Sequence, residues 1–276
     1  RLYLKALCDI ASPTERISFV ALNDVTLGTS ELRRYTTNRL GAWETCHRSK
    51  GHFIRATLRL SRTHRHLICG HVAQLPVAWA ARLLRPRLSY DLVAHGIEVW
   101  RPFSLAERLA LRGARRILCV SAATRDAMQP YCRLPAERFV VLPNALDPFF
   151  PIATAVTPPA APVIATVSRL SRADSYKGID HLIQALPRIR EAIPQARLQI
   201  MGQGDDLPRL TKLARENGVA EAVEFSGFVS DAEMQNKLRA CALFALPSQR
   251  EGFGLVFLEA MAQGRPCLGA RAGGIP

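Results

Sequence analysis

Short apolar runs alternate with longer, helix-like segments along the whole of this 276-residue chain. The runs carry apolar residues in succession rather than at every second position, which is typical of parallel strands covered on both faces of a sheet. We expect strands at 16–22, 66–70, 90–94, 116–120, 138–142, 162–167, 197–201, 223–227, 243–247 and 266–270. Helices are expected between them, for example at 104–113, 177–192, 207–217 and 231–240. The pattern predicts an α/β fold with parallel sheets.

The clearest seam in the chain is PFFPIATAVTPPAAP, which is rich in proline and alanine and poor in charge. The charge balance changes at the same place. Residues 1–150 hold 23 Lys and Arg against 11 Asp and Glu, whereas residues 151–276 hold 14 against 12. We therefore predict two Rossmann-like domains with a cleft between them, at 1–150 and 163–276, joined by a linker at 151–162.

Both ends of the chain look cut relative to a complete pair of such domains. Residues 1–10 already read as a helix, so we expect the N-terminal domain to lack its first strand. The chain stops at RAGGIP directly after a strand, so we expect the C-terminal domain to lack its closing helices.

Composition narrows the class of protein. Hydrophobic residues make up 48% and charged residues 22% of the chain, a balance typical of globular proteins, and no apolar run approaches the roughly 20 residues of a membrane span. The seven cysteines are scattered, with no C-x-x-C pair. We expect buried, reduced thiols in a cytosolic protein, and neither a disulfide frame nor a zinc site.

One carboxylate interrupts an otherwise apolar stretch. The run after EGFG reads LVFLEAMA, so Glu259 lies among residues expected in the interior, eight residues after Glu251. A buried carboxylate is costly unless another group pairs or hydrogen-bonds with it. Glu259 is therefore either a core carboxylate paired with an arginine or a ligand-binding group.

Two loops of the C-terminal domain carry the residue types that bind phosphate. Arg169 and Lys177 follow the strand at 162–167, whereas Gly252 and Gly254 follow the strand at 243–247 and open a helix. Ligands of parallel sheets bind at the carboxyl ends of the strands, and free amides at a helix start suit an oxyanion.

These cations and amides could neutralise a diphosphate, and Glu259 could then accept hydrogen bonds from ribose hydroxyls. The alternatives are that Arg169 and Lys177 are solvated loop charges and that the EGFG turn is only a helix cap.

The segments LPSQREGFGLVFLEAMAQGRPCLGARAGGIP and VSRLSRADSYKGIDHLIQAL resemble the donor-binding signature of retaining glycosyltransferases of family 4, which have the GT-B fold. Glu251 and Glu259 match the E-x7-E pair of that family, and DLVAHGIEVW and VLPNALD are similar to parts of its N-terminal domain. The stretch MGQGDDLPRL lacks the third glycine of a dinucleotide fingerprint, which disfavours NAD. P-N-A-L-D replaces the usual P-N-G-V-D, so Ala145 has to avoid a positive φ.

The resemblance implies a role for each matching residue. Arg169 and Lys177 would bind the donor diphosphate, and Glu259 the ribose hydroxyls. Glu251 would face the transferred sugar, and His95 would reach it from the N-terminal domain. The remaining donor-binding positions implied are Gly252, Phe253, Gly254, Leu255, Phe228 and Val229, the last two meeting the base.

The implied function is transfer of a hexose from a GDP- or UDP-linked donor to a glycan or lipid-linked acceptor, with retention of configuration. The family works without metal or other cofactor, and envelope polysaccharide synthesis is the expected setting. An alternative is a nucleotide-sugar epimerase of the same fold, which shares the donor site but needs no acceptor.

The basic N-terminal half raises two further hypotheses. Residues 46–66 carry six Arg and Lys with Phe53, Ile54, Thr57, Leu58 and Leu60 on one possible helix side. This face could dock on anionic lipids, which would place a cytoplasmic enzyme on the inner face of the plasma membrane, or it could be an ordinary solvated helix face. Nucleic-acid binding is the remaining alternative, but it leaves Glu251 and Glu259 unexplained.

Overall fold

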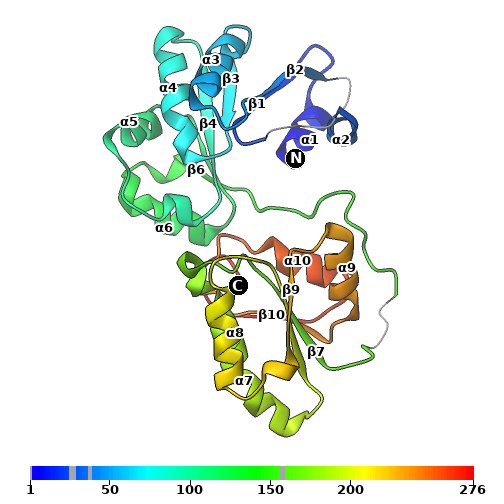
Figure 1. The fold of residues 1–276 in the computed structure, drawn as a ribbon. Coiled ribbons are helices and arrows are strands. Elements are labelled where there is room, and N and C mark those ends of the chain that lie inside the picture. The colour runs from blue at the N-terminus through cyan, green and yellow to red at the C-terminus, as the bar shows by residue number, and fades with distance from the viewer. Residues whose placement is uncertain (1, 25–28, 37–38, 156–158) are drawn as a thin grey trace. The chain divides into compact units, whose positions relative to one another are not determined.

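The structure is a computed structural model that describes residues 2–24, 29–36, 39–155 and 159–276. It divides into two compact units, Arg1–Pro143 (unit 1) and Asn144–Pro276 (unit 2), and each is described by itself. The predicted linker lies inside unit 2, and its residues 156–158 fall outside the described residues. Figure 1 shows both units as α/β folds, which confirms the predicted fold class.

Unit 1 contains twelve of the described α-helices and strands. In chain order they are α1 (Leu2–Ile10), β1 (Ile17–Ala21), α2 (Thr29–Tyr35), β2 (Leu40–Thr45), α3 (Lys50–Ser61), β3 (His66–Cys69), α4 (Leu75–Leu84), β4 (Ser89–Ala94), α5 (Leu105–Gly113), β5 (Ile117–Cys119), α6 (Ala122–Cys132) and β6 (Phe139–Val141). The strands β3, β4, β5 and β6 form one parallel sheet in sequence order.

The strand β1 lies outside that main sheet, which the sequence does not predict. It pairs in parallel with β2, and Phe19 stacks on Trp43 with ring centroids 6.1 Å apart. The pattern of β2 is hard to recognise because Gly41 and Glu44 interrupt its apolar residues. A Cβ at Gly41 would lie 2.8 Å from the Ser18 hydroxyl, so a larger residue there would require the Ser18 side chain to shift.

The core of unit 1 lies between the main sheet and its helices. Tyr90 on β4 is fully buried, and its hydroxyl donates a hydrogen bond of 2.6 Å to the Ala110 carbonyl of α5. Burying an aromatic side chain whose hydroxyl keeps a partner stabilises the fold by about 2 kcal/mol or more. The α5 helix is fixed at its other end by a capping box between Ser104 and Glu107.

Unit 2 is built around one five-stranded parallel sheet. Its elements are β7 (Val163–Val167), α7 (Ile179–Ala192), β8 (Arg197–Met201), α8 (Leu207–Glu216), β9 (Val223–Gly227), α9 (Asp231–Ala240), β10 (Leu243–Leu246), α10 (Leu255–Ala262) and β11 (Cys267–Gly269). The strand order is β11-β10-β7-β8-β9. All ten predicted strands are therefore present across the two units, and every pairing between them is parallel.

The strand order fixes where unit 2 can bind a ligand. The chain runs from β7 outward to β8 and β9, then returns to the other side of β7 with β10 and β11. The carboxyl ends of β7 and β10 flank the point where this order reverses, and such points are where open α/β sheets bind ligands. The two loops singled out from the sequence follow these two strands.

The structure also tests the predictions made from the sequence for the cysteines, for Ala145 and for membrane spans. All seven cysteines are free, and six of them are buried, as expected for reduced interior thiols. Ala145 is not among the residues with positive φ, so the expected backbone adjustment is confirmed. Across the ranges that the structure describes, no helix combines the length and apolar character required to span a bilayer.

Candidate active site at the switch point of unit 2

The loops after β7 and β10 are tied together directly. Lys177 donates from Nζ to Oε2 of Glu251 at 2.5 Å, and the two side chains are 21% and 15% exposed. The Gln249 amide donates to the Tyr176 carbonyl at 2.8 Å. Gly178 lets the loops approach, because a Cβ there would lie 2.7 Å from the Pro247 carbonyl oxygen. The structure therefore brings Lys177 and Glu251 into one site.

Arg169 also has a carboxylate partner, which the sequence analysis did not identify. Its Nε donates to Oδ2 of the buried Asp174 at 2.5 Å, while the Tyr176 hydroxyl donates to Oδ1 of Asp174 at 3.1 Å. The guanidinium lowers the pKa of Asp174, whereas burial first and the Asp174 contact second raise the pKa of Tyr176 to about 12. Arg169 itself remains 74% exposed, so a ligand can reach it.

Lys177 is therefore an ion-paired, mostly buried cation and not a solvated loop charge, whereas Arg169 is ion-paired and also open to solvent. Each cation is held by a carboxylate, Asp174 for Arg169 and Glu251 for Lys177. Such pairs hold the cationic ends at the carboxyl edge of the sheet, with Lys177 mostly buried and Arg169 open to solvent. An incoming anion would compete with these carboxylates for the same donors.

The EGFG turn forms the start of α10. Gly254 has φ +83° and precedes the helix without any side-chain cap, so the first amides of α10 have no acceptor from a capping side chain. A Cβ at Gly254 would lie 2.7 Å from the Phe257 ring and 3.3 Å from Glu251 Cγ. The Gly274 amide donates to the Glu251 carbonyl at 2.7 Å and fixes the turn from the other side. The turn thus begins α10 close to Glu251, an arrangement that fits both a helix cap and a ligand-binding loop.

Glu259 lies one turn into α10 and is half-buried. Within the described part of the chain its carboxylate has neither a hydrogen-bond partner nor an ion-pair partner. Burial raises its pKa, and the nearby Asp231 carboxylate raises it further. The alternative that Glu259 is a core carboxylate paired with arginine is therefore wrong. Ionisation of Glu259 therefore carries a cost to the fold, because burial and Asp231 both disfavour its charge.

The loop between β9 and α9 lies on the Glu259 side of the site. Asp231, the first residue of α9, is close enough to influence Glu259 electrostatically, and Phe228 and Val229 precede it. The Phe228 side chain is 78% exposed, whereas Val229 packs against the core of unit 2. The implied base-binding residues and the implied ribose-binding residue thus belong to neighbouring segments.

The glycines of MGQGDD have a packing role. A Cβ at Gly202 would lie 1.8 Å from the Ser168 carbonyl oxygen, and one at Gly204 would lie 2.0 Å from the Leu170 carbonyl oxygen. The loop after β8 therefore packs against the backbone of the loop that carries Arg169. A cavity of about 10 Å³ beside Arg169 and Asp174 is no larger than one water requires.

His95 lies at the carboxyl end of β4 in unit 1, as the sequence predicts. Its Nε2 donates to the Gly70 carbonyl at 2.9 Å, and its backbone amide donates to Glu98 at 2.6 Å. The ring is exposed and oriented by these contacts. Its predicted role toward a sugar concerns both units and stays a prediction.

A metal centre has no candidate ligands in the ranges that the structure describes, since no group of three or more His, Cys, Asp or Glu side chains there could hold an ion. The site in unit 2 instead combines two paired cations, a helix start and an unpaired carboxylate. This set can bind a diphosphate and a vicinal diol.

Curated relatives match parts of the chain. It is 42% identical over 118 residues to a GDP-mannose-dependent alpha-(1-6)-phosphatidylinositol monomannoside mannosyltransferase of Mycobacterium tuberculosis, covering 40% of this chain and 31% of the relative. It is 34% identical over 178 residues to a D-inositol 3-phosphate glycosyltransferase of Corynebacterium aurimucosum, covering 58% and 42%. The matches thus span well under half of these relatives' length.

Solved structures share the fold over more of the chain. A lipopolysaccharide outer core galactosyltransferase in its apo form aligns with a TM-score of 0.71 at 19% identity, covering 99% of this chain and 76% of that one. The Anabaena protein HepE in complex with UDP-glucose aligns with a TM-score of 0.67 at 25% identity, covering 80% and 64%.

Two family descriptions account for the two halves of the chain. "Glycosyltransferase Family 4" matches residues 26–149, and "Glycosyl transferases group 1" matches residues 156–276. Together with the parallel sheets of both units, these matches confirm the resemblance noted from the sequence. The chain belongs to the family 4, group 1 glycosyltransferases of the GT-B fold.

Proposed function

We propose that this chain provides the donor site of a hexosyltransferase that uses a nucleotide-diphosphate sugar. The observation that carries the proposal is the unpaired, half-buried Glu259 beside the Lys177–Glu251 pair, at the switch point of unit 2. A carboxylate without a partner is costly in an isolated fold, and a bound ribose would satisfy it through two hydroxyl donors.

The two cations then take the diphosphate. Phosphate oxygens replace Asp174 at Arg169 and Glu251 at Lys177, and the free amides at the start of α10 donate to the remaining oxygens. As the bond between the sugar and the diphosphate breaks, negative charge grows on the leaving phosphate. Cations held at that point lower the barrier, and they do so without a metal ion.

Release of Glu251 from Lys177 has a second consequence. The carboxylate becomes free to accept hydrogen bonds from the hydroxyls of the transferred sugar. The acceptor hydroxyl attacks from the face that the diphosphate leaves and passes its proton to the leaving phosphate, which preserves the anomeric configuration.

GDP-linked mannose is the donor we infer, because the curated relatives include mannosyltransferases named as GDP-mannose-dependent. Their names also point to a lipid-linked acceptor. The epimerase alternative gains no support, since the curated relatives and the galactosyltransferase structure described above carry transferase names.

Calorimetric titration of GDP-mannose and UDP-glucose into the chain, with EDTA present, tests the proposal. We expect GDP-mannose to bind and GDP to compete with it; binding of UDP-glucose alone would overturn the inferred donor but keep the donor site. Failure of both donors to bind would refute the proposed donor site. Product analysis with lipid acceptors then separates transfer, which joins sugar to acceptor, from epimerisation, which leaves a free nucleotide sugar.

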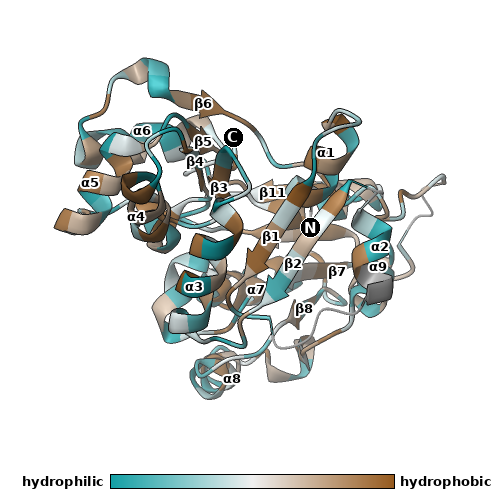
Figure 2. Cartoon of the chain, turned by 90° about the horizontal axis from the view of Figure 1, so that it is seen from above, coloured by the Kyte–Doolittle hydropathy of each residue, from teal (hydrophilic) through white to brown (hydrophobic). Residues whose placement is uncertain are grey.

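We also propose peripheral attachment to the inner face of the plasma membrane through α3. The exposed side of α3 carries Arg55 and Arg59, although Arg59 also contacts Glu44. The apolar side suggested by the sequence is mostly used inside unit 1, where Phe53 and Ala56 are buried, and Ile54 is 42% exposed. Figure 2 shows the hydrophilic residues of α3 in teal. Attachment would therefore depend on charge more than on insertion.

Co-sedimentation with vesicles tests this attachment. Binding should require anionic lipid and weaken as salt is raised. Equal sedimentation with purely zwitterionic vesicles would refute it.

A further inference from the structure

Unit 1 contains a pocket that the donor site does not use. It has a volume of about 440 Å³ and lies at the amino ends of the strands of the main sheet, beside the first residue of β4, Ser89, and just before β5 and β6. His95 follows the opposite, carboxyl end of β4. The volume falls within the range of about 300–1,000 Å³ that small-molecule sites occupy.

Arginine dominates the lining of this pocket. Five of its ten lining residues are arginines and none is acidic; the arginines are Arg82, Arg87, Arg112, Arg115 and Arg138. They come from the ends of α4 and α5 and from the segments before β4, β5 and β6, which parallel pairing brings together. Like charges on one surface repel one another, and a bound anion reduces that repulsion.

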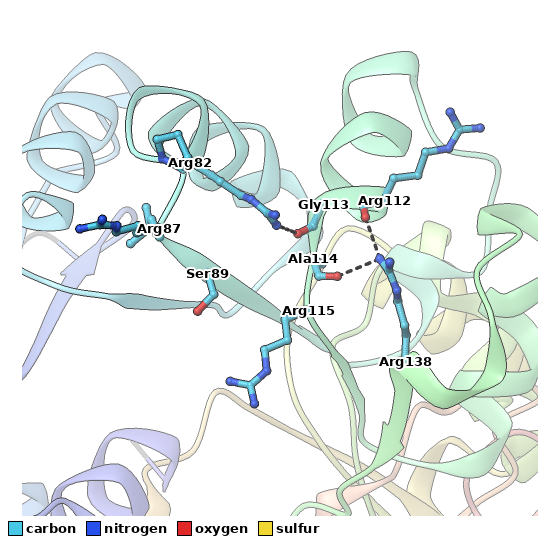
Figure 3. Close-up of a pocket in the computed structure, with 10 residues that line it drawn as sticks. Arg82, Arg87, Ser89, Arg112, Gly113, Ala114, Arg115 and Arg138 are labelled. Atoms are coloured by element: carbon cyan, nitrogen blue, oxygen red, sulfur yellow. Dashed lines mark hydrogen bonds between the residues drawn. The ribbon is translucent and has the colours of Figure 1, made fainter.

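Two of the five arginines have structural partners. Arg82 donates to the Gly113 carbonyl, and Arg138 donates to the carbonyls of Arg112 at 2.7 Å and Ala114 at 3.1 Å. Figure 3 shows both guanidinium groups directed at the end of α5. They satisfy carbonyls that a helix end leaves free, so their presence needs no ligand.

The other three arginines have no such explanation. Among the described residues, the side chains of Arg87, Arg112 and Arg115 make no hydrogen bond or ion pair, and all three are exposed. In Figure 3 their side chains point outward from the rim of the pocket, in different directions. The Ser89 hydroxyl is already hydrogen-bonded to Nδ1 of His66 at 2.7 Å, so recognition of a ligand falls to the arginines. Guanidinium groups bind phosphate oxygens in a bidentate manner.

We infer that this pocket binds a multiply charged phosphate group, at a site separate from the donor site. The ligand chemistry is a phosphate ester or diphosphate, which could come from a soluble metabolite or from a lipid headgroup. Arg87, Arg112 and Arg115 close on it by side-chain rotation, while Arg82 and Arg138 hold the pocket floor.

Titration calorimetry with inorganic pyrophosphate tests the soluble source. The pocket variant replaces all three rim residues, Arg87→Gln, Arg112→Gln and Arg115→Gln. The control variant removes the same charge from exposed arginines without side-chain partners, as Arg108→Gln, Arg188→Gln and Arg215→Gln. Thermal melts establish that both variants fold. We expect pyrophosphate to bind about tenfold or more weakly to the pocket variant than to the control.

Vesicles of phosphatidylglycerol, against phosphatidylcholine, test the lipid source with the same two variants. Selective loss of vesicle binding in the pocket variant identifies a headgroup as the ligand. Equal binding by the two variants in both arms would overturn the inference, because it would reduce the effect to net charge. Pyrophosphate bound at the donor site is unaffected by the rim substitutions and is recognised by its loss in Arg169→Gln, so failure here leaves the proposed donor site untouched.

Discussion

Replacement of Glu259 by glutamine should have opposite effects on the fold and on nucleotide binding. The half-buried carboxylate has a raised pKa, because burial and the Asp231 carboxylate both disfavour its charge. An amide of the same shape removes that charge. At about pH 7 we expect Glu259→Gln to melt at the same temperature as the wild type or up to about 3 °C higher.

Nucleotide binding should change in the other direction. An ionised carboxylate accepts two charge-assisted hydrogen bonds from the ribose, whereas the amide offers one neutral acceptor. Charge-assisted bonds contribute about 1.5–3 kcal/mol and neutral ones about 1 kcal/mol. A loss of about 2 kcal/mol is expected at this partly exposed position, which corresponds to about a 30-fold higher Kd.

The assay is calorimetric titration of the nucleoside diphosphate that binds the wild type, alongside thermal melts from acidic to neutral pH. The raised pKa means that the native state holds its proton longer than the unfolded chain as pH increases. Wild type should therefore lose stability relative to Glu259→Gln as pH rises through the titration of Glu259, and match it at lower pH. The control is Glu191→Gln, which removes an exposed charge from α7. A Kd within twofold of the wild type, or a melting temperature several degrees lower, would refute the reasoning.

Three further predictions concern contacts that stabilise unit 1 or unit 2. Lys177→Gln should destabilise unit 2 by about 1–2 kcal/mol by leaving Glu251 unpaired, and adding Glu251→Gln should recover part of that loss in denaturant melts. Gly204→Ala should lower the free energy of unfolding by more than about 3 kcal/mol, because its Cβ would lie 2.0 Å from a backbone oxygen. Gly218→Ala, at φ +68° in open space, should lower it by about 1 kcal/mol. Similar losses in the two variants would refute the packing role of Gly204. The Arg101 contact is the main cause that lowers the pKa of Glu107 to about 2, so Glu107→Gln should destabilise unit 1 by about 1–2 kcal/mol at neutral pH. That difference should fade between about pH 4.5 and 2, and a constant difference would contradict it.

The fold could be predicted from the sequence because each buried parallel strand is a continuous run of apolar residues. The strand β2 could not be predicted, because Gly41 and Glu44 interrupt its run of apolar residues. The separation of β1 from the main sheet could not be predicted from the sequence either. It depends on which strand pairs with which, and periodicity carries no such information.

The candidate site could be located but not completed. Sequence position places Arg169, Lys177 and Glu251 at the carboxyl ends of two strands, and the structure shows those strands to be neighbours. The pairing of Arg169 with Asp174 depends on how the loop folds back on itself, and the approach of Asp231 to Glu259 depends on packing. Neither of these two contacts can be read from the local sequence pattern.

The arginine pocket of unit 1 could not be predicted from the sequence either. Its five arginines are spread from Arg82 to Arg138, so no local cluster signals them in the sequence. Parallel pairing of β4, β5 and β6 gathers the segments that precede these strands.

The most direct test of the donor-site account is hydrogen–deuterium exchange of the chain with and without GDP or UDP. The account predicts that the nucleotide that binds will slow exchange at 168–177 and 249–259, which are the loops after β7 and β10 with the first turns of α10. Residues 85–89 and 112–116, around the arginine pocket, should exchange unchanged. Protection confined to unit 1, or no protection with either nucleotide, would contradict a donor site at the switch point of unit 2.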